Sequence, residues 1–115
     1  MEFAEINDNI SKFFCILVFI RIKTIQNMIR VEKPTGEKLL KLNVKSWPVW
    51  EKEISEFPWE YDEPETCYIL EGDVVVTPDN GTPVSFGKGD LVVFSSGLKC
   101  RWKINEAVRK HYKFG

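Results

Sequence analysis

The clearest alternation of apolar and polar residues in this chain falls on residues 98–104. The apolar positions are Leu98, Cys100, Trp102 and Ile104, and a lysine or arginine stands between each pair. Because successive side chains of a strand point to opposite faces, this pattern predicts a strand half buried against a core. Residues 108–114 alternate in the same way, although Lys110 places a charge on the face that is otherwise apolar.

Short β-branched or aromatic runs separated by turns fill most of the remaining chain. We expect strands over residues 29–32, 44–50, 66–70, 74–77, 84–86 and 91–94. Residues 71–73 are expected to form a hairpin turn or the bend of a strand pair, and Asn80-Gly81 is expected to form a tight hairpin turn. One short helix is predicted to begin at Thr35 and to end at Asn43. Together these elements predict an all-β antiparallel sandwich or small barrel.

Two stretches differ from the rest of the chain. Residues 51–65 are strongly acidic and contain Pro58 and Pro64, which favours a solvated loop. Residues 13–20 form an apolar run that is too short to span a membrane, and a buried helix, a β segment or an interfacial anchor all fit it. We therefore divide the chain into an N-terminal extension, residues 1–28, that need not belong to the fold, and a domain over residues 29–115.

Charge and cysteine content exclude several classes of protein. The 16 basic and 17 acidic residues give a net charge of −1, so we expect neither nucleic acid nor a membrane as a partner. Three cysteines without a C-x-x-C pair favour reduced, buried thiols over a disulfide framework or a zinc site. These features predict a cytoplasmic protein, and they leave organellar targeting by the extension open.

Two motifs carry a resemblance to a known family. Residues 59–72 follow the spacing of the first cupin motif, G-x5-H-x-H-x3-E-x6-G, with Glu65 and Gly72 at the Glu and closing Gly positions. Residues 89–104 follow the second motif, G-x5-P-x-G-x2-H-x3-N, with both glycines present. The domain therefore resembles the cupin superfamily, in particular small cupins related to the ureidoglycine aminohydrolase cupin domain. This resemblance implies a jelly-roll β-barrel, and the family habit of pairing implies a homodimer.

The same alignment with the motifs predicts that the metal site of these cupins is degenerate. The resemblance assigns four positions to metal ligands, and this chain places Trp59, Tyr61, Glu65 and Cys100 there. The aminohydrolase is a manganese enzyme, whereas an indole, a phenol, one carboxylate and a thiol make a poor set for a hard divalent cation. We therefore expect no metal and no cofactor.

A ligand pocket is the function that remains for such a barrel. We expect its wall to include Trp59, Tyr61, Glu65, Cys67, Cys100, Trp102 and Lys110. A buried Glu65 needs a partner, and Lys110 is the available one. The first hypothesis is a binder of a small polar ligand. The alternative is an enzyme that uses Glu65, Tyr61 and Cys100 in a non-standard site, and a purely structural Glu65–Lys110 pair is also compatible with the sequence.

Overall fold

A computed structural model describes residues 29–115 of the chain, and the predicted extension over residues 1–28 lies outside the described residues. The elements, in order, are β1 (Ile29–Glu32), α2 (Gly36–Leu42), the 3-10 turn η1 (Val44–Ser46), β2 (Val49–Lys52), β3 (Ser55–Glu60), β4 (Glu65–Pro78), β5 (Val84–Gly87), β6 (Leu91–Phe94) and β7 (Lys99–Phe114). Within the described part of the chain, no helix is long and apolar enough to cross a membrane.

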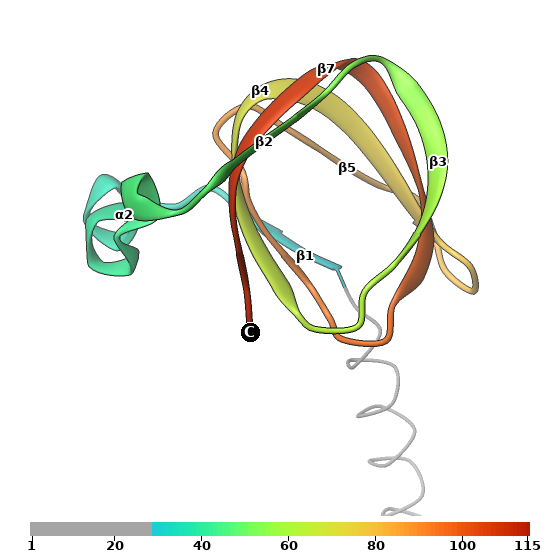
Figure 1. The fold of residues 1–115 in the computed structure, drawn as a ribbon, viewed down its shortest axis with the longest axis horizontal. Coiled ribbons are helices and arrows are strands. Elements are labelled where there is room, and N and C mark those ends of the chain that lie inside the picture. The colour runs from blue at the N-terminus through green and yellow to red at the C-terminus, as the bar shows by residue number, and fades with distance from the viewer. Residues whose placement is uncertain (1–28) are drawn as a thin grey trace, which may run out of the picture.

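The strands form one antiparallel sheet that curves around an enclosed core (Figure 1). The two longest strands, β4 and β7, pair with each other along nearly their whole length. β6 pairs with the first part of β4 and β5 with its second part, while β3 and β2 extend β7 in the same manner. The predicted all-β antiparallel barrel is therefore confirmed.

Of the two alternatives for residues 71–73, the hairpin turn is wrong and the bend is present, because β4 continues through them as one strand. β4 runs through this point, and its register against β7 shifts between Ile69 and Val74. Gly72 has a φ of +130°, and a Cβ at this position would lie 2.9 Å from the Cα of Val108. Glycine is thus required here both by the backbone conformation and by the close approach of β7.

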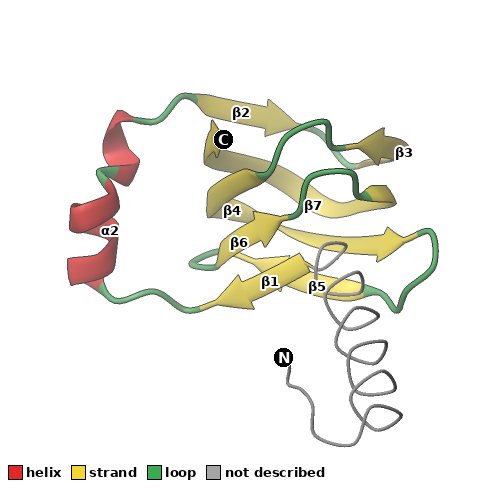
Figure 2. Cartoon of the chain, turned by 90° about the horizontal axis from the view of Figure 1, so that it is seen from below, coloured by secondary structure: helices red, strands yellow, loops and turns green. Residues whose placement is uncertain are grey.

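The alternation of β7 is confirmed by burial. Cys100, Trp102 and Ile104 are buried, and the basic residues between them are exposed. The helix α2 also follows its predicted signals, because the Thr35 side chain accepts a hydrogen bond from the Lys38 backbone N–H and Asn43 adopts the left-handed conformation. Figure 2 shows α2 at one end of the barrel, apart from the sheet.

Three local predictions are wrong. Residues 51–65 are not a continuous loop, because β2 ends within this stretch and the whole of β3 lies in it, both paired with β7. Residues 44–46 form η1 rather than the start of a strand. A turn does form over residues 78–81, in which the Gly81 backbone N–H donates to the Pro78 carbonyl oxygen at 3.2 Å. However, neither Asn80 nor Gly81 has a positive φ, and the connection between β4 and β5 spans residues 79–83, so the expected two-residue hairpin loop is wrong.

Candidate functional site

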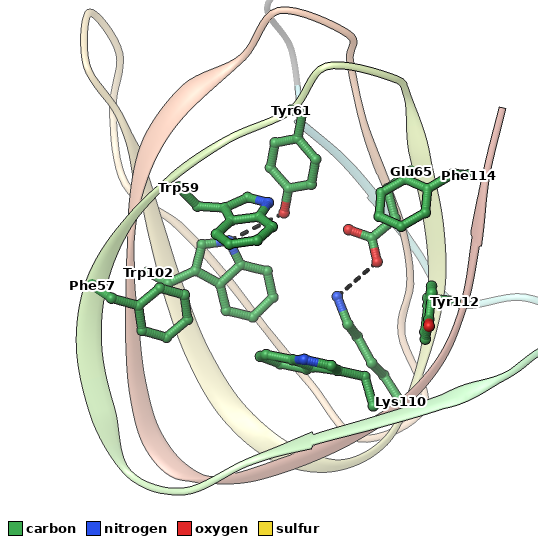
Figure 3. A pocket seen from close by; sticks show the side chains of 9 residues that line it. Phe57, Trp59, Tyr61, Glu65, Trp102, Lys110, Tyr112 and Phe114 are labelled. Carbon is green, nitrogen blue, oxygen red and sulfur yellow. Dashed lines mark hydrogen bonds and ion pairs between the residues drawn. The ribbon is translucent and has the colours of Figure 1, made fainter.

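A pocket opens into the barrel between β2, β3, the start of β4 and β7 (Figure 3). Its interior volume is about 70 Å³, roughly half of the ~150 Å³ cavity that accommodates a benzene molecule. Its lining residues are Trp50, Phe57, Trp59, Tyr61, Glu65, Trp102, Lys110, Tyr112 and Phe114. The interior therefore has room for a group of only a few non-hydrogen atoms, and a larger ligand would project through the mouth.

An ion pair lies at the base of this pocket. The Lys110 Nζ donates to Glu65 Oε2 at 2.8 Å, and the two side chains are only 6% and 3% exposed. Glu65 is the first residue of β4, while Lys110 lies opposite Ile69 in the register of β7 against β4. Burial of two charges is unfavourable by itself, and the short contact offsets part of that penalty.

Aromatic rings surround the ammonium group of Lys110. Its Nζ lies 4.9 Å from the ring centroids of both Trp50 and Trp102 and 6.0 Å from that of Phe94. These distances are within the range of about 6 Å over which a ring face attracts a cation. We call Trp50, Trp102 and Phe94 the aromatic cage.

Tyr61 adds a buried hydroxyl to the pocket. Its ring stacks on Phe94 with a centroid distance of 4.7 Å, and its oxygen accepts a hydrogen bond from Trp102 Nε1 at 3.1 Å. Burial, reinforced by the Glu65 carboxylate, raises the pKa of Tyr61 far above its ordinary value, so the phenol is neutral. Because an indole N–H only donates, the O–H proton of Tyr61 is directed elsewhere, and among the described residues no acceptor is paired with it.

The mouth of the pocket is apolar. Trp59 and Phe114 both line the pocket and are 49% and 45% exposed, so they form its solvent-facing rim. Trp59 meets Tyr61 edge to face at 6.4 Å, and Phe57 stacks on Trp102 at 6.0 Å behind it. A ligand that enters would therefore contact aromatic surface before it reached the ion pair.

A family model described as "EutQ-like cupin domain" matches residues 39–112. The chain belongs to this family. The comparison with curated proteins gave no match.

Solved structures support the same assignment. A DUF861 family protein from Thermotoga maritima is 58% identical, with a TM-score of 0.76, and the match covers 76% of this chain and 100% of that one. A DUF861 family protein of unknown function from Pseudomonas syringae is 29% identical over 58% of this chain and 29% of its own, with a TM-score of 0.53. The EutQ protein of Clostridium difficile, 19% identical over 75% of this chain and 66% of its own with a TM-score of 0.54, shares the fold.

The residues of this cupin at the metal-ligand positions do not fit a divalent metal. Glu65 is engaged by Lys110, Tyr61 is neutral, and the Cys100 thiol donates to the Trp59 carbonyl oxygen at 3.6 Å. The single histidine, His111, directs Nδ1 to the Trp47 carbonyl oxygen at 2.9 Å. Among residues 29–115 no three His, Cys, Asp or Glu side chains gather closely enough to hold a metal ion.

The structure brings together five of the seven residues proposed for the pocket. Trp59, Tyr61, Glu65, Trp102 and Lys110 line it, whereas the two cysteines do not. Cys67 is fully buried in the core, and burial raises the pKa of its thiol to about 12. Cys100 borders a separate open depression beside Asp79, and burial, followed by the negative charge of Asp79, raises the pKa of its thiol to about 11.

Sequence reasoning missed four lining residues. Tyr112 and Phe114 share the inward face of β7 with Lys110, so the period-two alternation could have identified them. Trp50 falls within the predicted strand over residues 44–50, which carries no sign of a pocket, and Phe57 lies in the acidic stretch for which a loop is expected. Their inward positions depend on the pairing of β2 and β3 with β7, for which the local sequence gives no signal.

Proposed function

We propose that this cupin binds a small polar ligand inside its barrel, with the Glu65–Lys110 pair as the polar recognition element. The observation that carries the proposal is a buried ion pair that faces a pocket rather than packed side chains. Replacing a buried ion pair by apolar residues of similar volume is often neutral or stabilising, so stability alone is a weak reason to keep one. An ion pair that contacts a ligand contributes to binding as well as to stability, which gives a functional reason for its presence.

The shape of the pocket supports the same proposal. Ligand sites in proteins are concave and mostly apolar, with a few polar groups that fix orientation. Here aromatic side chains form most of the wall, and Glu65, Lys110 and Tyr61 contribute polar groups to the interior (Figure 3). The small interior and the apolar rim favour a ligand with a compact polar head and an apolar remainder.

The alternative function, an enzyme that uses Glu65, Tyr61 and Cys100, has less support. A nucleophilic cysteine reacts as the thiolate, and catalytic cysteines have lowered pKa values. Burial instead raises the pKa of Cys100 to about 11, and its thiol borders a different depression from the one that Glu65 lines. The raised pKa of Tyr61 likewise makes its phenol a poor base at neutral pH.

The test is a titration of the full chain with benzamide, benzoate and benzylammonium, three fragments of similar size with a phenyl ring, followed by the indole N–H resonance of Trp102. We expect at least one fragment to shift this resonance saturably. The double variant Glu65→Leu/Lys110→Met, which keeps the pocket lined but removes its charges, should lose the response. Lys103→Met, on the exposed face of the same strand, should retain it.

Two outcomes would refute the proposal. If none of the three fragments shifts the Trp102 resonance, the pocket does not serve ligands of this size. If the double variant binds them as well as the unaltered protein does, the ion pair is not the recognition element and has a structural role alone.

A further inference from the structure

The aromatic cage is already occupied by a cation of the protein. An arrangement of tryptophan and phenylalanine rings would ordinarily suggest a ligand with an ammonium group. In this pocket the Lys110 ammonium lies 4.9 Å from two of these rings, and Glu65 holds it there at 2.8 Å. A second cation could approach the rings only against the charge of Lys110. The cage therefore argues against a cationic ligand.

The charges that line the pocket sum to zero. Lys110 and Glu65 neutralise each other, and the phenol of Tyr61 is neutral because burial raises its pKa. A charged ligand would bring a third charge into this environment and would find no free counter-charge on the wall. A buried charge without a partner is strongly unfavourable, so the electrostatics favour a ligand without net charge.

Besides the absence of net charge, the Tyr61 hydroxyl sets a second requirement for the ligand, which is a hydrogen-bond acceptor. The Tyr61 residue is 2% exposed, and Figure 3 shows its oxygen directed toward the interior, across the pocket from Glu65. Its lone pair is used by the Trp102 indole, so the group is left with one O–H to donate. A buried donor without an acceptor is unfavourable by about 1–3 kcal/mol, and an oxygen on the ligand would relieve this penalty.

From these observations we infer that the ligand is an uncharged molecule whose oxygen accepts a hydrogen bond from the Tyr61 hydroxyl. Carbonyl compounds such as primary amides meet both conditions, and their planar head is small enough for the interior. An apolar remainder would lie against Trp59 and Phe114 at the rim. This inference rests on the proposed function, since it names the chemical class that the same pocket would accept.

The three fragments of the titration above differ in charge while they share a ring and a one-carbon head. Benzamide should bind at least about tenfold more tightly than either benzoate or benzylammonium, because each charged head lacks a partner in the pocket. Thiobenzamide keeps the shape of benzamide but has a weaker acceptor, and it should bind about fivefold less tightly to the unaltered protein.

The variant Tyr61→Phe tests the role of the Tyr61 hydroxyl in binding. Tyr61→Phe removes the hydroxyl and keeps the ring that stacks on Phe94, so it should weaken benzamide binding by about fivefold. Tyr68→Phe is the matched control, because Tyr68 alternates with the buried Cys67 and Ile69 and does not line the pocket. We expect it to bind benzamide like the unaltered protein. If Tyr61→Phe does not fold, the comparison of benzamide with thiobenzamide on the unaltered protein decides the same question.

The outcomes separate this inference from the proposed function. Tighter binding of benzoate or benzylammonium than of benzamide would overturn the inferred absence of charge and leave the pocket as a binding site. Equal binding of benzamide and thiobenzamide, or of benzamide by Tyr61→Phe and the unaltered protein, would overturn the role of the hydroxyl. If no fragment binds, the proposed function fails and this inference fails with it.

Discussion

Two groups of buried side chains, drawn from β4, β7 and the connection between β3 and β4, differ in chemistry. The first, which we call the apolar cluster, consists of Val74, Val76, Ile104 and Val108, all at most 2% exposed. The second, the polar cluster, consists of Tyr61, Glu65 and Lys110, which are also buried but face a pocket. In the first cluster Val74 is the register partner of Ile104 on the neighbouring strand, and both side chains belong to the buried core.

The contrast shows that strand geometry decides which residues point inward, while the side chain decides whether the inward space is filled. Apolar residues on facing strands interdigitate and give a close-packed core. A lysine and a glutamate in equivalent positions are stable only if they form an ion pair. Here Lys110 Nζ lies 2.8 Å from Glu65 Oε2. Proteins depart from an apolar interior mainly where function requires it, which is why the polar cluster is the candidate site.

The largest expected effect comes from breaking the ion pair. Lys110→Met keeps the approximate length of the side chain but leaves the Glu65 carboxylate buried without its partner. We expect the free energy of unfolding at neutral pH to fall by about 3–5 kcal/mol, as measured by urea denaturation.

The double variant Glu65→Leu/Lys110→Met sharpens this prediction, because it removes both charges. It should recover most of the lost stability, since an apolar pair of similar volume is often as stable as a buried ion pair. A double variant as unstable as Lys110→Met would show that the loss arises from packing and not from an uncompensated charge.

A substitution to methionine in the apolar cluster should lower the free energy of unfolding less than Lys110→Met does. Ile104→Met conserves volume and polarity at a fully buried position, so we expect a loss below about 1.5 kcal/mol. Lys103→Met, next to it on the exposed face, should change stability by no more than about 0.5 kcal/mol. If Ile104→Met were as damaging as Lys110→Met, the two clusters would not differ in the way described.

The fold was largely predictable because alternation is a local signal. The alternation over residues 98–104 predicts that Cys100, Trp102 and Ile104 share a buried face, and the structure confirms it. β3 was missed because its acidic residues and Pro58 suggested a loop. In the structure Glu56 lies opposite Lys103 and Glu60 opposite Lys99, so acidic residues of β3 face basic residues of β7. Such a pairing joins segments that are distant in the sequence, so no local sequence pattern predicts it.

The candidate site was predictable in its charged residues and less so in its wall. Lys110 stood out as the one charge on an apolar face, and Glu65 as a carboxylate among inward positions, which was enough to suggest their contact. The cysteines share the inward parity of their strands, yet Cys67 lies within the core and Cys100 turns to the Trp59 carbonyl. Parity gives the side of a strand and does not say where along the barrel a cavity remains open.

A third prediction concerns pH and the core thiol beside the polar cluster. Burial, partly countered by the charge of Lys110, raises the pKa of Cys67 from 9.0 to about 12. The unfolded chain therefore ionises first, so the contribution of the neutral thiol is complete below pH 9 and is lost as the pH rises from 9 toward 12. Relative to Cys67→Ala, the unaltered protein should lose about 1 kcal/mol of stability between pH 8 and pH 10.

The pH prediction is checked by urea denaturation of both proteins at matched pH values, because deprotonation of other groups then cancels in the difference. A constant difference between the two proteins from pH 8 to pH 10 would mean that the thiol ionises equally in the folded and unfolded states, in conflict with its burial.

The smallest expected effect is that of a chelator. In a metal-dependent cupin the carboxylate of the first motif binds the cation, whereas here the equivalent Glu65 binds Lys110, whose positive charge would repel a metal ion. Neutral Tyr61 and a Cys100 thiol with a pKa of about 11 are weak donors at neutral pH, and Trp59 offers none. A tight site needs about three good donors, so we expect untagged protein to carry well below one equivalent of transition metal by elemental analysis, and its melting temperature to be unchanged by chelator. A stoichiometric metal that disappears in Glu65→Ala would contradict the assignment of Glu65 to the ion pair and would make a metal-dependent activity the leading hypothesis.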